Sequence, residues 1–167
     1  GLASAGIEPH RLELEITETV IMSNNQSNFD LLNKIHSLGV KIALDDFGTG
    51  YSSLNYLRSF PFDKIKIDRC FVEEVASRED CQAIIRAVAG LATSLGMVTT
   101  AEGIECEEQL AQVKRAGCKL VQGHLFSKAI PAHEIAGRVV KSRPELADRD
   151  AMPESETTLD YTRRRIG

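Results

Sequence analysis

The sequence lacks several features that would assign it to a special class of protein. No signal peptide is visible in it, and no apolar run comes near the roughly 20 residues that a membrane-spanning helix needs. Its four cysteines include no Cys-x-x-Cys pair, and no histidine cluster accompanies them. We therefore expect reduced thiols packed in a cytoplasmic protein rather than a disulfide framework.

An excess of positive charge is also lacking. The formal net charge is −4 at pH 7, which argues against non-specific binding of a nucleic-acid polymer. What is present is an ordinary globular mixture, because hydrophobic residues make up 43% and charged residues 26% of the 167 residues. The chain begins with Gly1 rather than methionine, so we expect a fragment or a processed product.

A repeated unit organises the chain: an amphipathic helix, a glycine and then a short strand. We predict helices at 28–39, 81–96 and 107–117, each closed by a glycine, and strands at 11–17, 40–46, 63–68, 97–102 and 118–123. The expected apolar faces are Leu31, Leu32, Ile35 and Leu38 on the first helix, and Ile84, Val88, Leu91 and Leu95 on the second. This alternation predicts an α/β domain with a parallel sheet, either doubly wound or part of a barrel.

The composition changes near the end of the chain. We assign residues 1–141 to the folded domain. Residues 142–167 are mostly charged or small and show no apolar period, so we expect a disordered tail.

Polar side chains gather on one face of the predicted strands. Since side chains alternate along a strand, the apolar residues share the face that meets the helices. The other face collects Glu15, Asp45, Lys66, Asp68, Glu102 and, at the last strand, Gln122. Burying such groups unpaired is very costly. Ligands of parallel α/β proteins bind beyond the carboxyl ends of the strands, where these residues lie.

The adjacent Asp45 and Asp46 favour a site for divalent cations. Cations relieve the repulsion among carboxylates most simply, and ligands that are all oxygen suit Mg²⁺, Mn²⁺ or Ca²⁺ rather than zinc. Two successive aspartates can serve two metals about 3.5–4 Å apart, the spacing used in phosphoester chemistry. Strict alternation would point the two side chains oppositely, so we expect a bend, which Gly48 and Gly50 would permit.

Simpler interpretations stay open for single residues. A strand-end aspartate such as Asp46 often caps a helix or sits in a turn. Lys66 could form a plain ion pair or act as a Schiff-base lysine, although nearby carboxylates favour its charged form. Gln122 alone carries almost no signal, and the four histidines show no spacing typical of metal ligands.

Several long motifs occur together in this chain: "LELEITET", "IALDDFGTGYSSLNYLRSFPFDKIKIDRCFV", "TTAEGIE" and "GCKLVQGHLFSKAIP". In this order they resemble the EAL domain, the family of bacterial phosphodiesterases specific for cyclic di-GMP. The resemblance covers about residues 1–140. It implies an eight-stranded (β/α) barrel of which this chain holds about the last five units. It also implies two Mg²⁺ or Mn²⁺ ions and hydrolysis of cyclic di-GMP to linear pGpG.

The resemblance also implies roles for individual residues. Glu15 and Asp46 match metal ligands, and Asp45 matches the ligand shared between both metals. Lys66 and Asp68 match residues that hold or orient the attacking water, and Glu102 matches a general base or second-metal ligand. Gln122 matches a residue near the substrate. Glu18 matches a glutamate that holds the loop "DFGTGYSS", through which such domains dimerise.

The chain departs from the family pattern at its start and near its end. The Glu-Ala-Leu motif with its arginine and the strand that carries an asparagine ligand are absent, so we expect this chain alone to be inactive. "LFSKAIP" replaces the commoner "FSRPLP", and His124 stands where tyrosine is common.

Two other functions are alternatives to cyclic di-GMP hydrolysis. One is a non-catalytic module that binds nucleotide or a protein partner, and the other is a different metal-dependent barrel enzyme. An upstream sensor or diguanylate cyclase domain is a further expectation.

Overall fold

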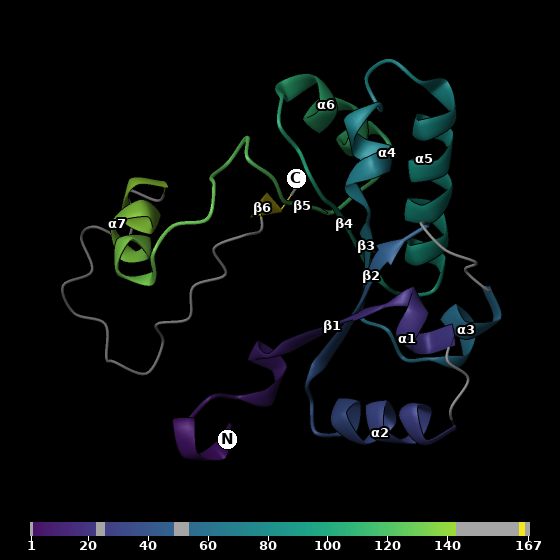
Figure 1. The fold of residues 1–167 in the computed structure, drawn as a ribbon, viewed down its shortest axis with the longest axis vertical. Coiled ribbons are helices and arrows are strands. Elements are labelled where there is room, and N and C mark those ends of the chain that lie inside the picture. The colour runs from purple at the N-terminus through teal and green to yellow at the C-terminus, as the bar shows by residue number, and fades with distance from the viewer. Residues whose placement is uncertain (1, 23–25, 49–53, 143–163, 166–167) are drawn as a thin grey trace.

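The computed structural model describes residues 2–22, 26–48, 54–142 and 164–165 (Figure 1). Two short 3₁₀ helices at Ala3–Ala5 and Pro9–Arg11 precede the sheet. The strands are β1 (Glu13–Thr17), β2 (Lys41–Phe47), β3 (Lys64–Ile67), β4 (Val98–Ala101), β5 (Leu120–Val121) and β6 (Arg164–Arg165). The helices are α1 (Glu18–Met22), α2 (Gln26–Ser37), α3 (Leu54–Ser59), α4 (Arg69–Glu73), α5 (Glu79–Ser94), α6 (Glu107–Arg115) and α7 (Ala132–Ser142).

The strands form one sheet in the order β1-β2-β3-β4-β5-β6. The first five pair in parallel, each with the next along the chain, and β6 pairs antiparallel with β5. The predicted α/β class and the five parallel strands are therefore confirmed. Strand order follows chain order without the reversal that a doubly wound sheet contains, so these units are arranged as in a (β/α) barrel.

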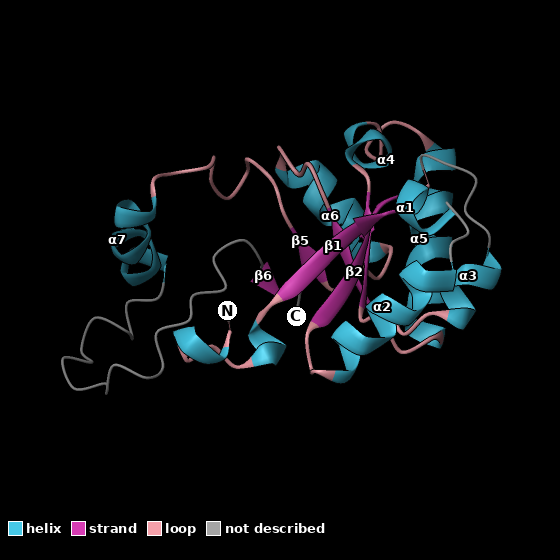
Figure 2. Ribbon diagram, turned by 60° about the horizontal axis from the view of Figure 1, so that its bottom comes forward, coloured by secondary structure: helices cyan, strands magenta, loops and turns pink. Residues whose placement is uncertain are grey.

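The core lies between the sheet and the helices. Helices α2, α3 and α5 lie together on one side of the sheet (Figure 2). One buried cluster contains Ile16, Ile42, Leu44, Phe47, Leu57, Phe60, Phe62, Ile65, Ala92 and Met97. The other contains Ile67, Val72, Val75, Ile85, Ala89, Ala101, Ile104, Val113, Ala116, Cys118 and Val121. The apolar side chains of the strands belong to these clusters, which leaves the opposite face of the sheet to the polar residues.

The apolar face of α2 differs from the predicted one. Leu31 and Leu38 are exposed, whereas Phe29 and Leu32 pack against the core. Phe29 stacks edge-on against Phe60 with ring centroids 5.2 Å apart. Because aromatic burial outweighs that of one leucine, the helix is oriented by Phe29, which the predicted face omitted.

The predicted face of α5 was right only in part, because Val88 and Leu91 pack against the core but are not its most buried residues. Its buried residues are Cys81, Ile85, Ala89 and Ala92, while Ile84 and Leu95 are exposed. These four positions form one stripe at helical spacing. Small side chains in that stripe let the helix approach the sheet closely, so the alanines pack there.

The predicted glycine caps are confirmed, since Gly39, Gly96 and Gly117 all have positive φ after their helices.

Helix α7 lies apart from the sheet (Figure 1). Of the predicted tail, the structure describes only Ser142 and the two arginines of β6, and 143–163 and 166–167 lie outside the described residues. None of the helices among the described residues is long and apolar enough to cross a membrane.

Candidate metal centre

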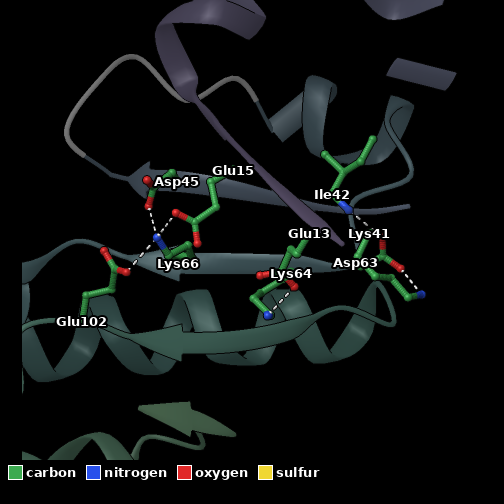
Figure 3. A network of polar contacts seen from close by, with 9 residues as sticks. All are labelled: Glu13, Glu15, Lys41, Ile42, Asp45, Asp63, Lys64, Lys66 and Glu102. Atoms are coloured by element: carbon green, nitrogen blue, oxygen red, sulfur yellow. Dashed lines mark hydrogen bonds and ion pairs between the residues drawn. The ribbon is translucent and has the colours of Figure 1, made fainter. Parts of the chain in front are cut away.

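A buried lysine connects three acidic side chains at the carboxyl ends of the strands. The Lys66 amine lies 2.8 Å from Glu15 Oε2, 2.8 Å from Asp45 Oδ1 and 2.8 Å from Glu102 Oε1. Figure 3 shows the three carboxylates converging on this amine from strands β1 and β2 and from the end of β4. Only 5% of the Lys66 side chain is exposed. The alternation of the strands thus brings Glu15, Asp45, Lys66 and Glu102 together as predicted.

The charge on Lys66 is fixed by this environment. Burial alone would lower its pKa, but hydrogen bonds to the three carboxylates outweigh burial and raise the pKa above its ordinary value. A Schiff-base lysine must lose its proton to attack a carbonyl. The geometry therefore favours a permanent cation over a nucleophile at this position.

Asp45 and Asp46 both reach the centre because the backbone turns between them. Asp46 has φ 54°, in the left-handed region, and the register of β2 with β3 shifts between Leu44 and Phe47. A bend at these two aspartates was predicted, with Gly48 and Gly50 expected to permit it. It occurs at Asp46 itself, with Gly48 also at positive φ, while Gly50 lies outside the described residues. Aspartate tolerates this conformation better than most residues.

Three carboxylates are close enough to share one cation. An oxygen from each of Asp45, Asp46 and Glu102 lies within 4.8 Å of the others. Burial raises the pKa of Glu102, and so do the charges of Asp45 and Glu15, against the lowering effect of Lys66. Burial and the neighbouring charges of Asp45 and Asp68 likewise raise the pKa of Asp46. Such crowding of oxygen ligands fits Mg²⁺, Mn²⁺ or Ca²⁺.

Asp68 joins the centre from the end of β3 and also begins a helix. Its Oδ1 accepts a hydrogen bond from the Cys70 amide at 2.9 Å, which makes it the N-cap of α4. Burial opposes ionisation, but hydrogen bonds from Cys70 and Arg69 lower the pKa of Asp68. A further hydrogen bond joins its side chain to that of Asp46. The capping role that was considered for Asp46 is thus found at Asp68, next to the candidate centre.

Two other predicted residues lie at the same edge of the sheet. Glu18 is buried, and its Oε1 accepts a hydrogen bond from the Gly48 amide at 3.1 Å. The next residues of the predicted loop, 49–53, lie outside the described residues. Gln122 follows β5 directly, and its main chain bonds to Ala101 at 2.9 Å and to Ile104 at 3.0 Å. The half-buried Gln122 is thus held beside the end of β4.

Sequence reasoning missed contacts between the loops that carry these side chains. A Cβ on Gly123 would lie 2.1 Å from the Ile104 carbonyl oxygen, so the loops after β4 and β5 touch through their backbones. It also missed an ion pair lower on the polar face, between the buried Lys64 and Glu13. Alternation places both residues on that face, so the pair could have been found. The backbone contact at Gly123 could not have been found in this way, because no periodic pattern in the sequence indicates it.

Comparisons with known proteins show the family of the chain. The family model of the EAL domain matches residues 2–129. Two similar Pseudomonas aeruginosa proteins are the cyclic di-GMP phosphodiesterase NbdA and the bifunctional diguanylate cyclase/cyclic di-GMP phosphodiesterase MucR. NbdA is 42% identical over 78% of this chain and 17% of its own length, and MucR is 40% identical over 80% and 19%.

Solved structures show the same likeness. The PaMucR phosphodiesterase in complex with c-di-GMP is 40% identical, with a TM-score of 0.75 over 80% of this chain and 54% of that chain. A manganese and cyclic di-GMP complex of Klebsiella pneumoniae BlrP1 is 36% identical, with a TM-score of 0.72 over 76% of this chain and 32% of that one. This chain therefore spans less than two thirds of each of these proteins. The chain belongs to the EAL domain family.

Proposed function

We propose that this chain supplies the catalytic edge of a phosphodiesterase domain that hydrolyses cyclic di-GMP to linear pGpG. The observation that carries the proposal is the group of Asp45, Asp46 and Glu102 with oxygens within 4.8 Å of one another at the carboxyl ends of parallel strands. The names of NbdA and MucR, and the cyclic di-GMP complex of PaMucR, support the choice of substrate.

We assign the cation site to Asp45, Asp46 and Glu102, with Glu15 on the neighbouring strand. The donors are all oxygen, which suits Mg²⁺ or Mn²⁺, and the manganese complex of BlrP1 supports the latter. Two ions are proposed, for which Asp45 would be the shared ligand and Asp46 a ligand of one. Bound divalent ions would neutralise charge on the phosphate and make a water molecule more acidic.

The side chains of the chain itself have distinct tasks in this scheme. Lys66 stays protonated and holds Glu15, Asp45 and Glu102 at fixed separations through its three 2.8 Å contacts. Lys66 and Asp68 are both assigned to the attacking water: Asp68 would orient it directly, and Lys66, whose three N–H groups all point to carboxylates, would do so through those carboxylates. The alternative role for Glu102, in place of cation ligand, is general base: with its pKa raised by burial, it would accept the proton of that water.

The remaining assignments concern the rim of the site and partner domains. Gln122, held beside the end of β4, contacts the substrate, and Glu18 fixes the loop that begins at Gly48. We propose that this loop forms a homodimer contact and that the domain works in the cytoplasm. A sensor or diguanylate cyclase domain in the same protein is also proposed, and the bifunctional name of MucR supports the latter.

The test is hydrolysis by the full product of the natural reading frame that contains this chain. The protein is incubated with cyclic di-GMP and Mn²⁺, and pGpG is measured by chromatography, with a sugar phosphate as comparison substrate. We expect pGpG to form, to stop on chelation, and to be lost in Asp45→Asn. Binding of cyclic di-GMP without cleavage would support the non-catalytic alternative, and preference for the sugar phosphate would support another barrel enzyme.

A further inference from the structure

A buried glutamine joins two segments that lead to different acidic residues of the metal centre. Gln109 lies in the first turn of α6, and only 8% of the residue is exposed. Its Oε1 accepts hydrogen bonds from the amides of Glu105 at 2.7 Å and Cys106 at 3.2 Å. Its Nε2 donates to the Glu73 carbonyl oxygen at 3.4 Å, across 36 positions of the chain. A buried amide group that lost these partners would be costly.

The two segments differ in which site residue they place. Glu73 ends α4, and the other end of this five-residue helix is capped by Asp68. Glu105 and Cys106 end the loop that begins with Glu102, directly after β4. A shift of α4 relative to that loop would therefore change the separation of Asp68 and Glu102. Gln109 bonds to both segments, so it opposes such a shift.

Other contacts between these segments are weaker or less specific. Arg69 in α4 forms an ion pair with Glu105 at 3.4 Å, but the two side chains are 55% and 47% exposed. Exposed pairs of this kind contribute little to stability. The side chain of Arg69 also lies over Gly103, where a Cβ would be 2.5 Å from its Cγ. The hydrogen bonds of Gln109 are buried, whereas the Arg69–Glu105 ion pair is exposed, so Gln109 makes the stronger connection between the two segments.

We propose that Gln109 is a positioning residue that sets the spacing of Asp68 and Glu102 for cation binding. The proposal rests on the proposed function, because it takes Glu102 as a cation ligand and Asp68 as the residue that hydrogen-bonds to the cation ligand Asp46. Gln109 would contact neither the cation nor the substrate. Its effect would pass through α4 on one side and through the loop of residues 102–106 on the other.

The decisive variant is Gln109→Glu. A glutamate at this position of a helix keeps the acceptor for the Glu105 and Cys106 amides, as in a capping box. It loses the donor to Glu73 and places two oxygens in opposition there. The added negative charge alone would strengthen cation binding, so weaker binding would have to come from altered spacing.

The chain offers a matched control in α5. Gln82 Nε2 donates to the Val75 carbonyl oxygen at 2.9 Å, just beyond α4. Gln82→Glu therefore removes the same kind of bond near the same helix, without touching the loop of residues 102–106. Loss of the Gln82 bond would loosen α4 only through α5.

The measurement is Mn²⁺ affinity by titration calorimetry in the full natural protein, with thermal unfolding of each variant beside it. We expect Gln109→Glu to raise the Kd about tenfold and Gln82→Glu to change it less than about twofold, since groups that hold ligands typically contribute 10–100-fold. Equal effects of the two variants, or none, would overturn the positioning role while leaving the cation site intact. A wild-type protein that binds no Mn²⁺ would overturn the proposed function and this role with it.

Discussion

Lys64 and Lys66 lie two positions apart on the same face of β3, and both are buried, yet their charge environments differ. Lys64 forms an ion pair with one acid, Glu13, so the two charges balance. Lys66 contacts three acids, which leaves negative charge in excess. A balanced pair needs no further partner, whereas three carboxylates crowded around one lysine favour the binding of another cation. We call Lys64 and Glu13 the lower layer and interpret it as structural support. We call Lys66 with Glu15, Asp45 and Glu102 the upper layer and interpret it as a site.

The strongest test of this difference removes one acid from each layer. Asp45→Asn keeps the shape of the side chain but weakens the proposed shared ligand, so kcat should fall by more than the 10²–10³ that one transition-state contact typically contributes. Glu13→Gln makes the matching change at the Lys64 pair, and we expect kcat to stay within about twofold of wild type, because Glu13 contacts Lys64 and not the proposed cation ligands. Steady-state hydrolysis of cyclic di-GMP measures both. Comparable losses in the two variants would contradict the division into layers.

A second test compares the two neighbouring aspartates. Asp46 reaches the centre through a left-handed backbone turn, and we assign it to one cation only. Asp46→Asn should therefore lose less activity than Asp45→Asn, and part of the loss should return at high Mn²⁺, because only one site is weakened. The check is kcat for both variants across a Mn²⁺ titration. Equal losses without metal rescue in either variant would reject Asp45 as the shared ligand.

The comparison of layers also separates what the sequence could predict from what it could not. Alternation along short strands placed Glu15, Asp45, Lys66 and Glu102 on one face, because that periodicity is local and the ends of parallel strands meet. The apolar faces of α2 and α5 were predicted less well, since packing partners decide how a helix is rotated. Contacts such as Gln109 with Glu73 join segments distant in sequence, and no local pattern records them.

A third test asks whether the lower layer needs its charges at all. Replacing a buried ion pair by apolar residues of similar size is often neutral or stabilising. We expect Glu13→Leu combined with Lys64→Met to keep kcat and to change the free energy of unfolding by no more than about 1 kcal/mol. Lys64→Met alone should cost about 2–3 kcal/mol, because Glu13 would lose its partner in a mostly buried position. Denaturant unfolding of the three proteins gives these values, and a double variant as unstable as the single one would contradict a purely structural pair.

The smallest expected effect concerns Thr100, which pairs in register with Lys66 on the next strand. Thr100 is fully buried, and its hydroxyl has no hydrogen-bond partner among the described residues. The adjacent Thr99, on the opposite face, has a hydrogen bond with the Cys118 thiol, whose pKa burial raises to about 11. Valine matches threonine in shape, so Thr100→Val should stabilise the fold by about 1 kcal/mol by removing a buried hydroxyl that lacks a partner.

Thr99→Val provides the matched control, because the same substitution there removes a hydrogen bond and should stabilise less or destabilise. Thermal unfolding of both variants measures the difference, and kcat should change in neither, since neither hydroxyl belongs to the proposed cation site. A loss of activity in Thr100→Val with unchanged Tm would show that the site extends sideways to this hydroxyl on β4. The boundary between site and support would then lie beyond Thr100 rather than between it and its register partner Lys66.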